Sequence, residues 1–309
     1  MIRKGLWTHI ARMTNHTSAR HPAFHALLVV AALLGAAEAA PLCIAEELKA
    51  ATVESFDRYV RTKEAKNDED LAGRAVFLWI DSLPEPARGK ASAELRRGQI
   101  ITRHDQCAPA PCASIPGGLI HDWVGIVFVP GVSMPQAIAA LEDYDQDAGY
   151  YQPQVMRSKL LERSGDDFRV FLRLKRAQIL TVVLDTEYDI HYTHWDATHA
   201  SARSYSTRIA EVEHAGEPQE REKPVGDDRG LLWRLYSYWR FYQADGGVYI
   251  QCEAISLTRD VPAGLGWLVR PFIDKIPADS LRFTLEATRK AIETSYRAGP
   301  VQETRNKRR

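Results

Sequence analysis

The sequence predicts an α+β fold in which a curved antiparallel sheet of about seven strands wraps around a long C-terminal helix. One observation is a series of six strand-like segments between residues 154 and 259, with no convincing helix between them. Another is an apolar helical stripe that closes the chain and consists of Leu281, Leu285, Thr288, Ile292 and Tyr296. Together they indicate one sheet and one closing helix.

The composition is that of a globular protein. Of 309 residues 45% are apolar, and 40 basic side chains balance 40 acidic ones. These values exclude a disordered or collagen-like chain, and the balanced charge argues against nucleic acid as the partner. Four cysteines, none in a Cys-x-x-Cys or zinc-ribbon spacing, do not make a disulfide scaffold or a metal site.

The first 39 residues have the pattern of a signal peptide. Basic residues precede an apolar run from Ala26 to Ala37, and Ala37-Glu38-Ala39 forms a cleavage site. The run is shorter than the roughly 18 to 20 residues that a membrane-spanning helix needs. We therefore expect cleavage after Ala39 and a soluble protein that is exported, either periplasmic or secreted. The alternative is an uncleaved amphipathic helix or a misassigned start.

Export would affect the oxidation state of Cys107 and Cys112, which flank an Ala-Pro-Ala-Pro loop. An oxidising compartment would allow the two thiols to form a disulfide, and we expect that they do. The alternative is a pair of free thiols in a surface loop.

Residues 40–117 are expected to form an N-terminal helical extension and linker. An amphipathic helix is predicted from Glu46 to Lys66, and a short strand over residues 75–82. A helical turn from Ala91 to Arg97 follows. The proline- and glycine-rich stretch from Cys107 to Gly118 then leads to the next unit.

Residues 118–298 are expected to form the main domain. Leu119 to Val129 is a predicted strand, and Ser133 is a predicted N-cap for a helix from Met134 to Tyr144. The six later strands are expected near residues 154–163, 168–176, 179–194, 202–213, 230–243 and 247–259. Pro277 is expected near the first turn of the main terminal helix. This order of elements is that of the helix-grip fold, and residues 299–309 are expected to be a basic disordered tail.

The dipeptide Asp245-Gly246 predicts a two-residue hairpin, because a type I′ turn needs positive φ at both positions. Placing Ala244 opposite Gly247 fixes the register of the two strands. The predicted pairs on one face are Phe241 with Ile250, Trp239 with Cys252, Ser237 with Ala254, and Leu235 with Ser256. The opposite face pairs Tyr238 with Glu253 and Arg240 with Gln251, as expected of a solvated or networked surface.

The same alternation divides the two preceding strands. Arg169, Arg173 and Lys175 lie on the side opposite the apolar residues, as do Asp185, Glu187 and Asp189 on the next strand. We interpret these charges as a cross-strand ladder on the outer surface rather than a binding patch.

The inner face is the candidate ligand-binding surface. Its predicted lining is Leu184, Tyr188, Tyr192, Trp233, Leu235, Ser237, Trp239, Phe241, Ile250, Cys252 and Ala254. Either the closing helix fills the space above these side chains, or small residues leave a cavity for an apolar ligand. We interpret Cys252 as a buried apolar residue and not as a nucleophile, because no basic neighbour is expected on its face.

Several segments of this region resemble START-like proteins of the birch-pollen-allergen-like (SRPBCC) superfamily. The resemblance covers about residues 118–295 and lies in the segments Leu231–Phe241, Gly246–Pro262, Gly264–Trp267, Ile276-Pro277 and Leu285–Arg289. It implies a helix-grip fold and a hydrophobic cavity for lipids, sterols, polyketides or other apolar molecules. It implies no catalytic residues.

Other chemistry has weaker support. His191 and His194 fall on opposite faces of one strand and cannot share an ion there, although His194 and Asp196 share a face to which His199 could return. We expect a polar strand end and no metal. No Gly-x-Ser-x-Gly elbow and no nucleotide-binding glycine motif is present, and we expect no cofactor. Tyr188, Tyr192 and His194 could serve a cyclase or hydratase as acid and base.

The sequence therefore predicts an exported protein that binds or carries a hydrophobic small molecule or lipid, with no catalytic residue assigned. A transient contact with a membrane and the oligomeric state stay open. The alternatives are a polyketide cyclase-like or hydratase-like enzyme that uses the same cavity, and a structural module without a cavity.

Overall fold

The computed structural model describes residues 48–73, 76–105, 114–177, 181–229, 231–260 and 266–298. The expected signal peptide, the Cys107–Cys112 pair and the basic tail lie outside these residues. Within them, no helix combines the length and the apolarity that crossing a membrane requires.

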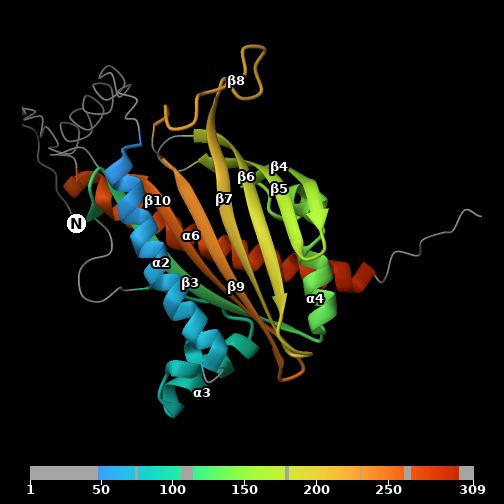
Figure 1. Cartoon of the computed structure of the whole chain (residues 1–309). Coiled ribbons are helices and arrows are strands. Elements are labelled where there is room, and N and C mark those ends of the chain that lie inside the picture. The colour runs from blue at the N-terminus through green and yellow to red at the C-terminus, as the bar shows by residue number, and fades with distance from the viewer. Residues whose placement is uncertain are drawn as a thin grey trace, which may run out of the picture. The chain divides into compact units, whose positions relative to one another are not determined.

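The sheet is antiparallel throughout and follows the order β1-β3-β10-β9-β7-β6-β5-β4 (Figure 1). Its strands are β1 Ile101–His104, β3 Gly118–Pro130, β4 Val155–Ser164, β5 Asp167–Ala177, β6 Thr181–His194, β7 His199–Glu213, β9 Arg234–Ala244 and β10 Gly247–Arg259. Two-residue strands β2 Ser114–Ile115 and β8 Arg221–Glu222 pair at its margins. The predicted main strands are confirmed, and β1, β2 and β8 are additions.

The hairpin between β9 and β10 has the predicted turn. Asp245 and Gly246 have φ angles of 53° and 74°, as a type I′ turn requires. The predicted register is confirmed, since Ala244 faces Gly247, and Trp239 faces Cys252. Strand β3 continues the ladder on the other side of β10 and places Gly125 beside Cys252.

Helices connect and flank the strands. They are α2 Ala50–Gly73, α3 Glu85–Arg96, α4 Met134–Leu141, α5 Asp147–Tyr150 and α6 Gly266–Ala298, with single 3₁₀ turns η1 Trp79–Ser82 and η2 Tyr144–Gln146. Ser133 caps α4 as predicted, and a capping box with Gln136 supports it.

Two predictions about helical segments were wrong. Residues 75–82 contain the turn η1 instead of a strand, because the Asp81 carboxylate accepts the Leu78 N–H at 2.7 Å and closes the turn locally. Helix α6 begins at Gly266, so Pro277 lies inside it rather than in its first turn. A proline costs a helix one backbone hydrogen bond there but does not mark its start.

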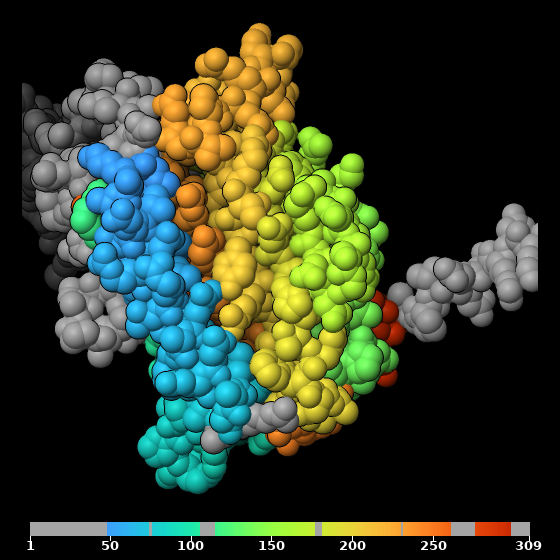
Figure 2. All heavy atoms as spheres, in the orientation of Figure 1, coloured from blue at the N-terminus to red at the C-terminus, as the bar shows by residue number. Residues whose placement is uncertain are grey.

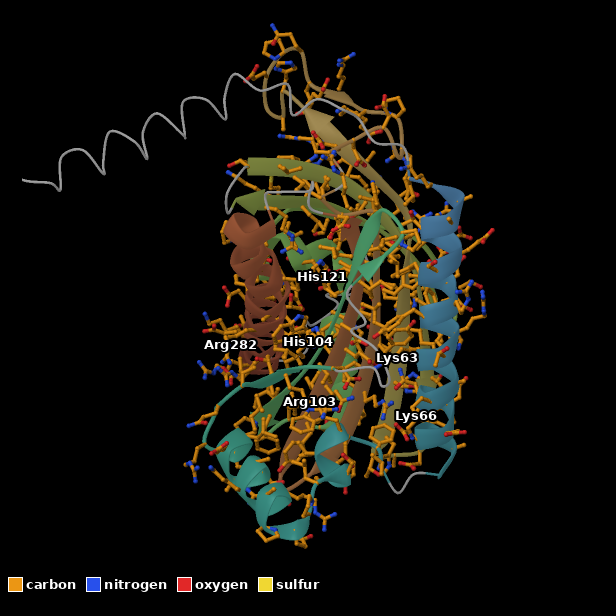
Figure 3. All side chains as sticks on the ribbon, turned by 90° about the vertical axis from the view of Figure 1, so that its left-hand side faces the viewer. Lys63, Lys66, Arg103, His104, His121 and Arg282 are labelled. Atoms are coloured by element: carbon orange, nitrogen blue, oxygen red, sulfur yellow. The ribbon has the colours of Figure 1, made fainter. Side chains whose placement is uncertain are left out.

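Helices α6 and α2 pack on opposite faces of the sheet (Figure 3). The inner face, on the side of α6, carries a core that includes Phe241, Ile250 and Cys252 together with Leu281 and Leu285 of α6. The outer face carries α2 over β3, β10 and β9, and its apolar cluster consists of Phe56, Val60, Ile120, Trp233, Tyr238, Ile255 and Leu257. The sheet is therefore covered on both faces at its β3-β10-β9 end.

Gly125 allows α6 to approach β3 closely. A Cβ at this position would lie 2.6 Å from Leu285 Cδ1 and 3.0 Å from Thr102 Cγ2, and Leu285 is fully buried. We expect Gly125→Ala to lower the free energy of unfolding by about 1 to 3 kcal/mol through overpacking. Urea denaturation measures this change. Gly89→Ala is the control, because Gly89 is an exposed helical residue with open space around it, and a fall of equal size there would contradict the account.

Candidate functional site

The inner face is buried at the turn end of β9 and β10 and partly exposed to solvent farther along these two strands. Phe241 and Ile250 are at most 1% exposed, and Cys252 is 2% exposed. Farther along the same face, solvent reaches six side chains in adjacent register positions. This inner strip consists of Trp123, Leu235, Ser237, Trp239, Ala254 and Ser256, each of intermediate exposure.

Four of the predicted lining residues, Leu235, Ser237, Trp239 and Ala254, belong to this inner strip. The Trp239 indole N–H donates to Ser237 Oγ at 3.0 Å, and the Trp239 ring stacks on Phe241. Small side chains at Ser237 and Ala254 lie beside the large rings of Trp239 and Trp123. The strip is thus an uneven apolar surface, only partly covered, on the face that α6 covers.

Strand β6 contributes the buried lining residues. Leu184, Tyr188 and Tyr192 are 2%, 5% and 4% exposed. The hydroxyls of Tyr192 and Tyr144 lie 2.9 Å apart, and burial raises the pKa of both. The Tyr188 hydroxyl is buried and has no hydrogen-bond partner within the described part of the chain.

One predicted lining residue lies elsewhere. Trp233 packs in the outer-face cluster with Phe56 and Val60 of α2, and its indole N–H donates to Asp228 Oδ1 at 3.2 Å. Strand β9 begins at Arg234, so strand alternation does not extend to Trp233. The prediction that Trp233 lies on the inner face was wrong, because side chains alternate between the two faces only within the strand.

Cys252 has the environment that was predicted for it. It is buried among apolar residues, and burial raises the pKa of its thiol well above the ordinary value. The thiolate is the nucleophilic form, so this position is inert.

The histidines of the 191–199 segment do not converge. Each contacts a different carboxylate: His191 pairs with Asp167 at 2.7 Å, His194 with Asp166 at 3.7 Å, and His199 with Asp196 at 3.0 Å. His194 is also half exposed at the strand end and is not brought to Tyr188.

Two residues, one on the inner face of β5 and one on the helix α5, were missed in the sequence. Arg176 extends the alternation of β5 past its apolar stretch, and Asp147 opens the one-turn helix α5. Burial and the neighbouring Asp143 raise the pKa of Asp147 to about 8, so its carboxyl is largely protonated at neutral pH. Strand alternation could have identified Arg176, because it places this residue on the same face as Phe168, Val170, Leu172 and Leu174.

The outer face carries one set of charges on β5 and β6 and another on β9 and β10, beneath α2. On β5 and β6 one pair of the predicted ladder is present, because Arg173 forms a two-bond ion pair with Asp185 directly across from it. Arg169 lies opposite Asp189 but pairs with Glu162, and Lys175 lies opposite Val183. This part of the surface has no helix over it in Figure 2, whereas α2 covers the strands beside it. Of the two alternatives for Arg240 and Glu253, a solvated or a networked face, the structure has the networked one, since each is about 5% exposed beneath α2.

An ionic network joins α2 to the sheet. Lys63 Nζ lies 2.6 Å from Glu253 and 3.0 Å from Asp122, and it also pairs with Asp105. In Figure 3, Lys63 points from α2 toward the strands. The three carboxylates lie within 4.8 Å of one another, and the Lys63 ammonium occupies the position between them that a cation would take.

Other side chains of α2 extend the network. Asn67 donates to Glu253 Oε2 at 2.9 Å and accepts from Arg240 Nη2 at 2.6 Å. Glu64 accepts from the hydroxyls of Tyr205 and Tyr238. Burial keeps these charges from water, so their mutual pairing decides whether α2 stays in place.

Asp122 makes this network depend on pH. Burial and the nearby Glu253 raise its pKa to about 7, despite Lys63 and the Tyr59 hydroxyl, which act in the opposite direction. A raised pKa favours the folded state at low pH; this contribution is complete below about pH 4 and is lost as the pH rises to about 7. We expect Asp122→Asn to flatten the fall in the free energy of unfolding over this range.

Urea denaturation at several pH values measures the effect. Asp227→Asn is a control in a surface loop. An unchanged pH profile in Asp122→Asn would contradict the assignment.

Comparisons with known proteins found similarity among solved structures. No protein-family model and no curated protein matches the chain. Among solved structures, the chain is similar to a STAR-related lipid transfer protein from Xanthomonas axonopodis, with 16% identity over 62% of this chain and 98% of that one, at a TM-score of 0.39.

Two other structures have the same TM-score of 0.39. They are the ZhuI aromatase/cyclase from Streptomyces sp. R1128, with 13% identity over 59% of this chain and 98% of that one, and human STARD10, with 11% identity over 70% and 84%. The strand order and the terminal helix decide the assignment. The chain has the helix-grip fold.

Proposed function

We propose that the protein binds or carries a hydrophobic small molecule or lipid between the inner face of the sheet and α6. The inner strip is the observation that supports this most directly, because its apolar side chains remain partly exposed on a face that is otherwise buried. Removing such surface from water stabilises a complex by roughly 25 cal/mol per Å². The Ser237 hydroxyl and the buried tyrosines can orient a ligand.

We also propose that this carrier is exported. The support is the leader pattern of residues 1–39, with its basic residues, apolar run and Ala-x-Ala site. An exported carrier would take its ligand in the cell envelope or outside the cell.

Ala254 gives a direct test of the binding site. Its partners across the sheet are Ser237 and Trp123, so Ala254→Phe places a ring over the inner strip. We expect the variant to bind the neutral dye N-phenyl-1-naphthylamine at least tenfold more weakly, as measured by fluorescence titration. Leu161→Phe, at an exposed position of β4, is the control and should bind like the wild type. Equal binding by all three proteins would place the dye elsewhere.

An enzyme of the cyclase or hydratase kind is the second candidate, and Asp147 is the observation that favours it. Its raised pKa, about 8, suits a general acid, and it acts electrostatically on Tyr151, whose hydroxyl lies 2.8 Å from Thr288 of α6.

Asp147→Asn separates this enzyme from a carrier. If the protein turns over a polyketide-like substrate, we expect the variant to lose turnover at least a hundredfold while it keeps dye binding. Product formation followed by mass spectrometry measures this. Turnover that survives the substitution would remove Asp147 from any mechanism.

A further inference from the structure

Arg176 lies on the inner face with no acidic partner. Its Nη1 atom donates to Gln154 Oε1 at 2.6 Å and to Ser280 Oγ of α6 at 3.0 Å. Both acceptors are neutral. Among the residues that the structure describes, no carboxylate lies within ion-pair distance of this guanidinium.

Several other arginines of the sheet have acidic partners. Arg173, three residues earlier on β5, pairs with Asp185 and with Glu220 on the outer face. Arg240 lies 3.9 Å from Asp70 beneath α2. Arg176 differs from these two arginines in having neutral hydrogen-bond acceptors alone.

The edge of the Arg176 guanidinium formed by Nε and Nη2 remains available for hydrogen bonds. An arginine has five N–H donors, and both hydrogen bonds of Arg176 come from Nη1. Nε and Nη2 form the fork that binds a carboxylate or phosphate through two parallel hydrogen bonds. Burial lowers the pKa of Arg176, although the residue keeps an intermediate exposure to solvent.

Tyr188 brings a second unsatisfied donor to the same region. Its hydroxyl is buried and unpartnered within the described chain, while the nearby Thr186 hydroxyl donates to the Leu172 carbonyl at 2.8 Å. Arg176 lies opposite Val182 and Tyr188 opposite Val170, so both residues lie on the inner face of β5 and β6. A contact with the Thr186 hydroxyl and, to a smaller extent, the Arg176 cation lower the pKa of the tyrosine. Burial is the larger effect and raises the pKa of Tyr188, so the hydroxyl stays protonated and can donate.

Apolar side chains surround these two donors. One cluster contains Val182, Leu184 and Leu174, and Leu235 packs against it. Leu235 also belongs to the inner strip, so the polar region and the inner strip meet at this residue. A ligand with a charged head group and an apolar chain matches a polar region that adjoins the apolar inner strip.

We propose that Arg176 and Tyr188 bind the anionic head group, a carboxylate or a phosphate ester, of an amphipathic ligand whose apolar chain lies along the inner strip. This assignment rests on the proposed function. The ligand supplies the negative charge that the protein does not, and it accepts a hydrogen bond from the tyrosine. The buried Tyr188 hydroxyl and the partly exposed Arg176 guanidinium then both bind the head group.

Displacement of N-phenyl-1-naphthylamine tests the assignment with three probes of one chain length: hexadecanoate, hexadecyl phosphate and hexadecan-1-ol. We expect the wild type to bind the better of the two anions at least tenfold more tightly than the alcohol. Which anion binds more tightly distinguishes a carboxylate from a phosphate head. Inorganic phosphate and acetate, which lack the chain, should not displace the dye.

The variants locate the head group. Arg176→Gln should weaken anion binding tenfold or more and leave the alcohol unchanged, and Arg176→Lys should restore part of the loss. Tyr188→Phe should weaken anion binding about threefold or more without loss of thermal stability, because its hydroxyl has no partner to lose. Arg169→Gln is the matched control, on the same strand but with its guanidinium on the exposed outer face.

The outcomes are distinguishable. Equal affinity for anion and alcohol in the wild type, unchanged by Arg176→Gln and Tyr188→Phe, overturns the assignment but leaves an apolar ligand site. Failure of the dye and all three probes to bind overturns the proposed function. If Arg176→Gln does not fold, two other measurements decide. The assignment is contradicted if the wild type does not prefer the anions over the alcohol, or if Tyr188→Phe binds the anions as tightly as the wild type.

Discussion

The two-residue turn at Asp245-Gly246 is the constraint on which the rest of the structure depends. It fixes the register of β9 and β10, and strand alternation then assigns each side chain to one face. Trp239 and Cys252 face α6, while Arg240 and Glu253 face α2. A slip of one residue would exchange these two sets, placing the charges against α6 and the aromatic rings against the ionic network.

The two faces bind their helices by different means. On the inner face, apolar residues such as Leu285 hold α6 against β3, and the inner strip beside them stays partly uncovered. On the outer face, Lys63 sits among three carboxylates and fixes α2 through buried charge pairs. Partly exposed apolar surface therefore lies on the face that packs against α6 through apolar contacts, and the buried charges lie on the face that α2 covers.

Local patterns predicted the local features. The turn, the β9-β10 register, the Ser133 cap and the Arg173–Asp185 pair all follow from residues that are near in sequence or directly across a hairpin. Burial of Arg240 could not be predicted this way, because its partner Asn67 lies 173 residues earlier. Arg176 was missed for a similar reason, since one of its neutral acceptors, Ser280, is 104 residues away.

A crystal structure of the complex with N-phenyl-1-naphthylamine tests the central claim most directly, because it shows which face of the sheet accepts an apolar guest. The account predicts the naphthyl ring between the sheet and α6, in contact with Trp239 and Ala254. A ring bound between the sheet and α2, or an inner face on which side chains of α6 leave no room for it, would contradict the account.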